Sequence, residues 1–220
     1  MGFQRARTDE QRNERRRQIL GAAASMLTEM PVSELTLNGL SRRACLAKAN
    51  VLRYFESREA VLLELLEAEG AHWIAELERE AVPGGGEVRE RENRLAELLA
   101  SSLARRPVLC DLVSAQATVL EHNISVETAI RHKHAVRGQL EALVRFIVRH
   151  LPELGDEGAS ALVRTVLIVV GSAWPSSRPP EALLAVYAAD PSLAALQIDF
   201  EDVVRHTVEV TASGLLARRQ

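Results

Sequence analysis

The chain has 220 residues, 47% hydrophobic and 26% charged, which is the balance of a globular protein with one large or two small domains. Its net charge of −3 is unevenly placed, because residues 1–58 hold 11 Lys and Arg against 6 Asp and Glu, while the remainder holds 16 against 24. The basic residues 1–58, which we call the head, precede an acidic body. This distribution favours a polyanionic partner for the head alone, although a solvated Arg-rich tail would have the same composition.

The beginning of the chain predicts neither a secretory segment nor a membrane anchor. Residues 5–17 are crowded with Arg, and no apolar run follows them. The longest apolar run, Val166–Val170, is far shorter than the roughly 20 residues of a membrane span. The two cysteines, Cys45 and Cys110, are too few for a disulfide framework. We therefore expect a cytoplasmic protein with no membrane partner.

Three helices are predicted at the N-terminus. The first runs from Asp9 to Met30, because apolar residues recur there at helical spacing, and Pro31 ends it. Thr36 is a good N-cap for a second helix that reaches Ala44. After a turn at residues 45–47, a third helix is expected from about Lys48 to Phe55.

The rest of the chain also reads as helical. Ser57 is a good N-cap for a long fourth helix, which ends before the flexible linker Pro83-Gly84-Gly85-Gly86. Further helices are predicted over residues 88–104, 107–122, 125–150, 155–174, 181–189 and 200–217. No strand-like alternation persists, and Gly and Pro are few, so the fold is expected to be all-α.

The sequence from Leu35 to Phe55 has the spacing of a helix-turn-helix. In such a unit the second helix lies in the major groove of DNA and presents its exposed side chains to bases and phosphates. If Val51 and Phe55 face inward, the opposite face carries a small set of polar groups suited to DNA: Lys48, Asn50, Arg53 and Tyr54.

The N-terminal region resembles the DNA-binding domain of the tetracycline-repressor (TetR) family over about residues 12–66. The resemblance rests on Arg17-Gln18-Ile19-Leu20, Ala22-Ala23, Leu35-Thr36-Leu37, Leu40, Ala44 and above all residues 50–62, with their Tyr-Phe-x-Ser-basic-Glu-x-x-Leu run. It implies an N-terminal helix-turn-helix domain over residues 9–56, with the motif at about 36–55, and a helical ligand-binding and dimerisation bundle over residues 57–220. It also implies these DNA contacts: Thr36, Asn38, Arg42, Lys48, Asn50, Leu52, Arg53, Tyr54 and Arg58.

The roles that the resemblance implies differ along this set. Arg53 would be the main base reader, and Arg58 would hold a phosphate at the start of the fourth helix. Three positions depart from the family pattern: Cys45 stands where Gly is usual in the turn, Ala49 stands where Gly is common, and Leu52 stands where a phosphate-binding Tyr is usual. A left-handed backbone at Cys45 would cost on the order of 1–2 kcal/mol.

Beyond residue 66 the sequence agrees with the family in helical character and length alone. Four residues are candidates for an effector pocket: Trp73, Leu77, His122 and Trp174. Two broad apolar helices near the C-terminus are candidates for a homodimer interface through Val163, Val166, Leu167, Val170, Val204, Val208, Thr211 and Leu215. The same helices could instead form the core of a monomer, as could the two tryptophans.

Other chemistries have weaker support. Cys45 could sense redox state, but a lone cysteine there is more often a small packed residue. The histidines lack metal-ligand spacing, and no nucleophile elbow or Gly-rich phosphate loop is present, so no cofactor or metal is expected. The sequence thus favours a repressor that binds a near-palindromic operator as a dimer and is released by a small apolar effector. The alternatives are a helical ligand carrier or enzyme with an incidental basic head, and an adaptor whose Arg-rich N-terminus binds an acidic partner.

Overall fold

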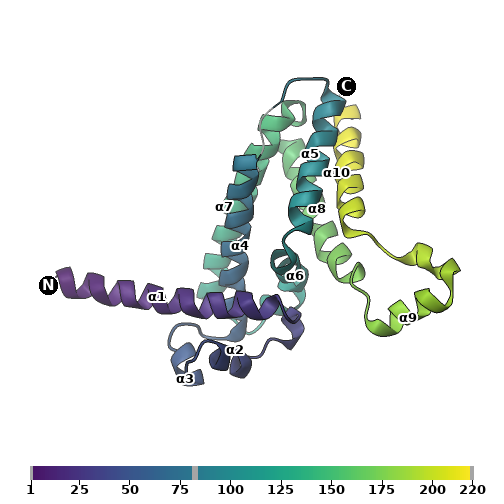
Figure 1. The fold of residues 1–220 in the computed structure, drawn as a ribbon. Helices are drawn as coiled ribbons and strands as arrows, with labels where there is room; N and C mark the ends of the chain where they lie inside the picture. Colours follow the sequence, from purple (N-terminus) through teal and green to yellow (C-terminus); the bar gives the residue numbers. More distant parts are fainter. Residues whose placement is uncertain (1, 81–83, 219–220) are drawn as a thin grey trace. The chain divides into compact units, whose positions relative to one another are not determined.

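The computed structural model describes residues 2–80 and 84–218, with side chains described from Glu10 onward. Pro83 of the predicted linker and Gln220 at the predicted domain end lie outside the described residues. Over the described ranges the chain is built from helices without strands, which confirms the all-α fold (Figure 1).

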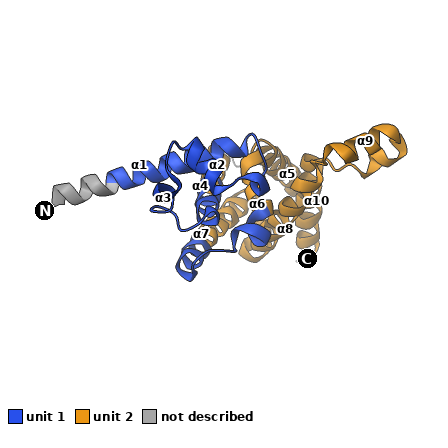
Figure 2. Ribbon diagram, turned by 90° about the horizontal axis from the view of Figure 1, so that it is seen from below, with its two compact units in different colours: residues 1–69, 115–135 blue, residues 70–114, 136–220 orange. Residues whose placement is uncertain are grey.

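Two compact units divide the chain, and the division differs from the predicted boundary after residue 56. Unit 1 comprises Met1–Glu69 and Ala115–Ala135, and unit 2 comprises Gly70–Ser114 and Val136–Gln220 (Figure 2). The long helices α4 (Arg58–Glu80) and α7 (Val126–His150) each contribute residues to both units. The first part of α4 therefore belongs to the same compact body as the helix-turn-helix.

Unit 1 begins with α1 (Gly2–Leu27), which is longer at its N-terminus than predicted and ends three residues earlier. Two turn hydrogen bonds, from the Glu29 and Met30 amides to the Met26 carbonyl, end the helix before Pro31. A single 3-10 turn (Val32–Glu34) then leads to α2 (Leu37–Arg43).

The two predicted N-caps of unit 1 are confirmed. The Thr36 Oγ1 accepts a hydrogen bond from the Gly39 amide at 3.1 Å at the start of α2. The Ser57 hydroxyl accepts one from the Ala60 amide at 3.1 Å at the start of α4. Each cap satisfies one of the amides that the first turn of a helix leaves without a partner.

The third helix is shorter than the sequence predicted, because α3 spans Lys48–Val51 and residues 52–54 form a turn. The Arg53 and Tyr54 amides donate to carbonyls three residues back, those of Asn50 and Val51. This tightening of the last turn is common at helix ends. Because Val51 and Phe55 are both buried, the polar face predicted for this segment is still displayed.

Unit 2 is a bundle in which α10 (Phe200–Ala217) packs against both α5 (Val88–Ala104) and α8 (Gly155–Ser176). Its remaining α-helical parts are the second part of α4, α6 (Pro107–Ala115), the second part of α7 and α9 (Glu181–Ala189). The helix predicted over residues 107–122 is interrupted, since Gln116–Leu120 adopts a π-helical turn that belongs to unit 1.

The segment Pro152–Ser176, which contains α8, is long and apolar enough to cross a membrane by length and composition. Continuous apolar runs in the sequence do not mark this segment as a membrane span. In the structure it forms part of the core of unit 2, with Leu162, Val166 and Val170 at most 4% exposed. A core helix buried on several sides has this composition.

Candidate nucleic-acid interface

The exposed surface of α2 and α3 carries the predicted DNA contacts. Asn38 and Arg42 on α2 are exposed, as are Lys48, Asn50 and Arg53 around α3, whereas Tyr54 is half-buried. Leu52 is 43% exposed, so it belongs to this outer face and not to the core stripe. The geometry thus places an amide, cations and one apolar side chain together on a short segment fixed from behind by Val51 and Phe55.

Arg16 of α1 fastens the end of this segment to two other helices. Its Nη1 donates to the Tyr54 carbonyl oxygen at 2.6 Å, and its guanidinium forms an ion pair with Glu64 of α4. The guanidinium carbon lies 4.3 Å from the centre of the Phe55 ring. Arg16 was not among the predicted site residues, although its spacing of three and seven from the buried Ile19 and Ala23 marks it as inward-facing.

Two further side chains join α1 to the end of α2. The Gln18 amide donates to the Ala44 carbonyl oxygen at 2.9 Å, where α2 has no further intrahelical donor. Arg43 forms an ion pair with Glu29, and this hydrogen-bonded partner lowers the pKa of the Glu29 carboxyl. Both contacts restrict the position of α2 on α1.

Arg58 lies where the resemblance implied a phosphate contact, but it also has partners within unit 1. Its Nη1 donates to the Leu35 carbonyl oxygen at 2.9 Å, and its guanidinium pairs with Glu59 at 3.0 Å. Next to it, Glu56 accepts a hydrogen bond from the Ser125 amide at 2.7 Å, which lowers the pKa of the Glu56 carboxyl. These contacts connect both ends of the helix-turn-helix to other parts of unit 1.

Cys45 occupies the turn between α2 and α3 with φ of 53°. This is the left-handed backbone expected at a position where the resembling family usually has Gly. The interpretation of Cys45 as a small packed residue is wrong, because the residue is exposed. The other cysteine, Cys110, is buried, and burial raises the pKa of its thiol to about 12. The turn therefore holds a non-glycine residue in a conformation that favours glycine.

Replacing Cys45 by Gly should stabilise the head. Glycine removes the left-handed penalty, and after its own loss of chain entropy the net gain in unfolding free energy should be about 0.5–1 kcal/mol. Urea unfolding followed by circular dichroism measures the change. Cys45→Ala is the matched control, since its Cβ keeps the penalty. Equal stabilities of the Gly and Ala variants would show that the turn stores no such strain.

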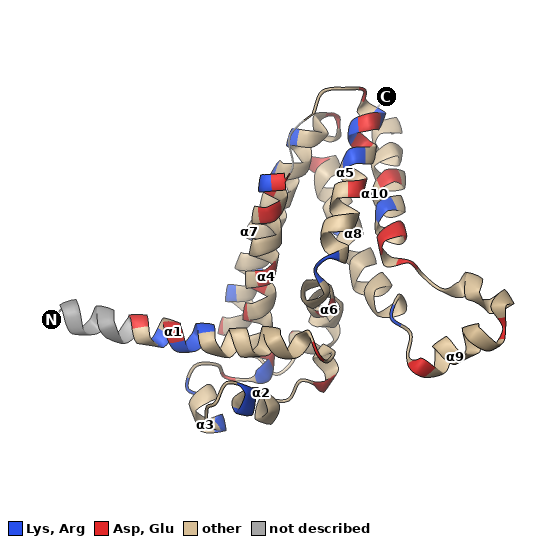
Figure 3. Cartoon of the chain, in the orientation of Figure 1, with Lys and Arg blue, Asp and Glu red and all other residues tan. Residues whose placement is uncertain are grey.

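A surface hollow of about 780 Å³ adjoins the end of α3. It is lined by Arg53 and Tyr54 together with residues of α1: Gln11, Arg12, Glu14 and Arg15. Lys and Arg are visible along α1, α2 and α3 in Figure 3. The structure thus brings exposed arginines of α1 close to Arg53, a grouping suited to a phosphate backbone beside a base reader.

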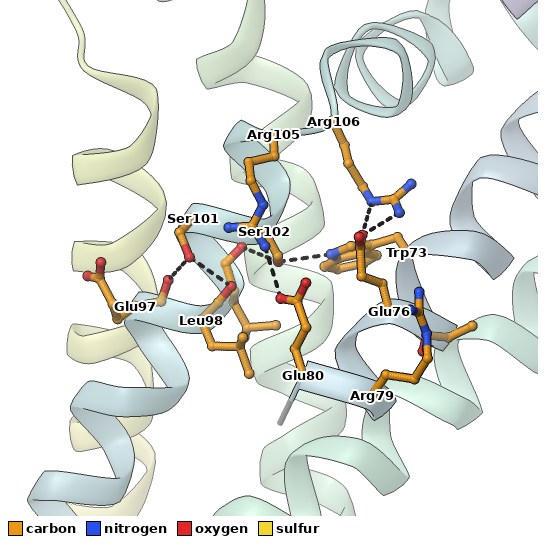
Figure 4. A network of polar contacts seen from close by, with 12 residues as sticks. Trp73, Glu76, Arg79, Glu80, Glu97, Leu98, Ser101, Ser102, Arg105 and Arg106 are labelled. Carbon is orange, nitrogen blue, oxygen red and sulfur yellow. Dashed lines mark hydrogen bonds and ion pairs between the residues drawn. The ribbon is translucent and has the colours of Figure 1, made fainter. Parts of the chain in front are cut away.

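In unit 2, Trp73 is held by a polar network shown in Figure 4. Its indole Nε1 donates to the Ser102 hydroxyl at 3.0 Å, and Ser102 donates in turn to the Leu99 carbonyl oxygen. One turn along α4, Glu76 pairs with Arg106, which lowers the pKa of the Glu76 carboxyl. The ring of Trp73 is thereby oriented within the bundle.

An apolar cavity of about 10 Å³ lies beside this ring, lined by Trp73, Leu99, Leu143, Ile147, Val163, Val166 and Leu167. This volume has room for about one water molecule. Any larger apolar ligand at this position must displace the lining side chains, so occupancy and helix packing are coupled in unit 2.

The other predicted pocket residues do not line this cavity. Leu77 is 1% exposed in the core. Trp174 contacts Phe200 edge-to-face at 5.0 Å and carries the Arg178 guanidinium 3.9 Å above its ring. His122 is exposed and belongs to unit 1, whereas Trp73, Leu77 and Trp174 belong to unit 2.

The predicted dimer residues divide into two groups. Five valines are at most 4% exposed within a single chain and are not available to a second copy: Val163, Val166, Val170, Val204 and Val208. Leu167, Thr211 and Leu215 are half-buried. The outward faces of the same helices instead carry Ile168, 71% exposed on α8, and Val210, 56% exposed on α10. The apolar periodicity of α8 and α10 therefore marked mainly the sides of these helices that pack in the core of one chain.

His132 is buried in unit 1 and has two polar partners. Its Nδ1 lies 2.8 Å from Glu67 and its Nε2 lies 3.2 Å from the Gln116 amide in the π-helical turn. This arrangement fits Nδ1–H donating to Glu67 and Nε2 accepting from Gln116. Among the described residues no three His, Cys, Asp or Glu side chains are placed to hold a metal ion.

Comparisons with known proteins agree with this geometry. A family model described as the tetracyclin repressor-like C-terminal domain matches residues 67–219. No curated protein sequence matches. Among solved structures, a TetR transcriptional regulator from a Rhodococcus species is 16% identical with a TM-score of 0.56, and the match covers 92% of this chain and 97% of that one.

Two regulators named FadR are also similar to this chain. FadR from Bacillus halodurans is 16% identical with a TM-score of 0.56, covering 90% of this chain and 94% of that one. FadR from Bacillus subtilis, solved with stearoyl-CoA, is 16% identical with a TM-score of 0.53, covering 90% and 97%. At these identities the structural likeness shows the fold, and the match of the family model covers more than half of the chain.

Proposed function

The chain belongs to the tetracycline-repressor family of transcriptional regulators, and from that premise we propose that it is a cytoplasmic, ligand-responsive repressor. It would bind a near-palindromic DNA operator as a homodimer and leave it when a small apolar effector binds. The family's members are regulators and not enzymes, and we propose the same for this chain.

The observation that carries the DNA-binding role is the outer face of α3 and the turn after it. Lys48, Asn50 and Arg53 are exposed together, while Val51 and Phe55 hold the segment on the core. An amide suits an adenine edge and a guanidinium suits a guanine edge. We propose Arg53 as the main base reader, with Arg12 and Arg15 of α1 contacting phosphates from the adjoining hollow.

Phosphate contacts are also proposed for Thr36, Tyr54 and Arg58. Arg58 would have to exchange or share its bond to the Leu35 carbonyl oxygen to reach DNA. Leu52 offers apolar contact, for example to a thymine methyl group, in place of the hydroxyl that the family pattern places there. Asn38 and Arg42 on α2 complete the proposed contact surface.

We propose that the dimer forms through the outward faces of α8 and α10. Ile168 and Val210 are the exposed apolar residues there, and Ser172, Ser213 and Gly214 on the same faces are also exposed and would permit close helix approach. A closed two-fold dimer would present two heads to successive major grooves, about 34–36 Å apart.

The effector is proposed to enter unit 2 at the apolar cavity beside Trp73. Stearoyl-CoA, present in the Bacillus subtilis FadR structure, has a long apolar chain, and the cavity lining here is of the same apolar character. Because the cavity holds only about 10 Å³, an effector would favour a bundle in which these helices lie further apart. Trp73 and Arg58 lie on one continuous helix, α4, which is the proposed link to the head.

The test is a titration of the full chain with duplexes from the DNA beside its own coding region, at several salt concentrations. We expect one duplex to bind at least about 1,000-fold more tightly than random DNA, with affinity falling steeply as salt rises. Equal affinity for all duplexes at every salt concentration would exclude a sequence-specific regulator.

A further inference from the structure

Residues 179–199, which we call the arm, connect α8 to α10 and carry an unusual share of exposed apolar side chains. The arm consists of α9 (Glu181–Ala189) and a 3-10 helix (Pro191–Leu196), and neither contains a buried residue. Five of the ten exposed large hydrophobic residues in the described parts of the chain lie here: Leu183, Leu184, Val186, Leu196 and Ile198. In both views α9 lies apart from α5, α8 and α10 of its own unit (Figures 1 and 2).

The arm is nevertheless built as an ordered hairpin. Asp190 accepts hydrogen bonds from the Ser192 amide at 2.9 Å and the Ser192 hydroxyl at 2.6 Å, which fixes the turn between its two helices. Where the arm joins α8 and α10, Trp174 and Phe200 pack edge-to-face, and Asp199 caps α10 by accepting a hydrogen bond from the Asp202 amide at 2.8 Å. A segment fixed at its turn and at this junction presents a defined apolar surface.

The apolar surface of the arm must pack against another surface for α9 to be stable. A helix of about nine residues is marginal in water, and most helical stability in proteins comes from packing an apolar face. In this chain α9 packs against the 3-10 helix of the same arm, and Leu183, Leu184 and Val186 stay 43–47% exposed. Exposed contiguous apolar surface of this kind marks an interaction site.

We infer that the arm packs on a second copy of this chain and extends the dimer interface. The only charged residues from 179 to 198 are Glu181 and Asp190, so the arm has no cation for a nucleic acid or an anionic membrane surface. It leaves from α8 and returns to α10, the two helices whose outward faces carry Ile168 and Val210. Two-fold symmetry then lets each arm cover the equivalent surface of the other copy, so that neither stays exposed.

This inference rests on the proposed homodimer and adds to it that the arm contributes binding energy. The decisive comparison is between the parent chain and the triple variant Leu183→Ser, Leu184→Ser, Val186→Ser. All three side chains are exposed in one chain, so the monomer fold should be unaffected. Val126→Ser with Ile130→Ser is a matched control, because these α7 residues are 76% and 55% exposed and lie outside both the arm and the proposed interface.

Sedimentation over a range of protein concentrations measures the dimer dissociation constant. The triple variant should dimerise at least about 30-fold more weakly than the parent, since it loses three apolar contacts in each of two arms, while the control stays within about twofold. A dimer as tight as the parent's in the triple variant overturns the inference and leaves the proposed function standing. A parent that stays monomeric at every concentration overturns the proposed dimer itself.

Hydrogen exchange gives a second measurement without altering the arm. The Ile168→Asp variant with Val210→Asp should be monomeric, and amides of residues 183–198 should exchange at least about tenfold faster in it than in the parent dimer. Equal exchange rates in the dimer and the monomer would show that the second copy does not cover the arm. If the triple variant instead lost binding to lipid vesicles while it dimerised normally, a membrane would be the partner and the inference would be wrong.

Discussion

Arg16→Ala is expected to lower the unfolding free energy of unit 1 by about 2–4 kcal/mol and to weaken DNA binding with it. The variant loses the ion pair with Glu64, the hydrogen bond to the Tyr54 carbonyl oxygen and the contact with the Phe55 ring. The side chains of Arg16 and Glu64 are 23% and 27% exposed, so solvent screens the lost pair only in part. Urea unfolding of the full chain, monitored with a probe that reports on unit 1, measures the loss of unfolding free energy.

The chain provides a matched control one residue along. Arg17 pairs with Glu14 at 3.1 Å, but both side chains are more than two-thirds exposed, at 69% and 67%. Arg17→Ala should therefore change stability by no more than about 0.5 kcal/mol. Arg16→Lys, which keeps the charge but not the forked geometry, should fall between the two. Equal losses from Arg16→Ala and Arg17→Ala would refute the role of Arg16 as the tie between α1, α3 and α4.

DNA binding should follow stability because Arg16 fixes the end of the reading segment. Without it, residues 52–54 lose their connection to α1 and α4, and Arg53 loses a fixed direction. If the binding loss in Arg16→Ala disappears at low temperature, where the head is fully folded, lower stability explains the loss. If the loss persists there, Arg16 is needed to position Arg53.

The N-terminal part of the fold could be predicted closely because local signals determine it. Thr36 and Ser57 are caps that act on amides three residues away, and both hydrogen bonds are present. The left-handed turn at Cys45 followed from a position that usually holds Gly. The length of α3 could not be read in the same way, because Val51 and Phe55 keep their helical spacing through a tightened turn.

The site's supports were harder to predict because they depend on tertiary contacts. Arg15, Arg16 and Arg17 are consecutive arginines, and although helical spacing turns Arg16 inward, it does not identify Glu64 of α4 as the partner of Arg16. The buried His132 likewise depends on Glu67 and Gln116, which lie 65 and 16 residues away. Sequence spacing within one helix carries no information on such partners.

Unit 2 shows the limit of apolar periodicity. The stripes of α8 and α10 correctly predicted broad burial, but Val163 and Val204 pack inside one chain, whereas the exposed faces carry Ile168 and Val210. A helix that is apolar on several sides does not reveal which side meets its own chain and which meets a partner. The arm was predicted as a short helix between 181 and 189, and only the structure shows that it has no cover.

Arg53→Ala is expected to remove most base recognition by the head. A bidentate contact to guanine contributes about 1–3 kcal/mol of discrimination, and a dimer makes it twice. The preference for the operator over random DNA should therefore fall by at least about tenfold, while binding to random DNA changes little. Arg12→Ala is the matched control, because Arg12 lines the same hollow from α1 and should contribute to phosphate binding alone.

The most direct measurement is the ratio of operator affinity to random-DNA affinity for the parent, Arg53→Ala and Arg12→Ala at one salt concentration. We expect a high ratio for the parent, an unchanged ratio with weaker binding overall for Arg12→Ala, and a ratio at least about tenfold lower for Arg53→Ala. An Arg53→Ala variant that keeps the parent's ratio would contradict the conclusion that the face of α3 reads DNA sequence.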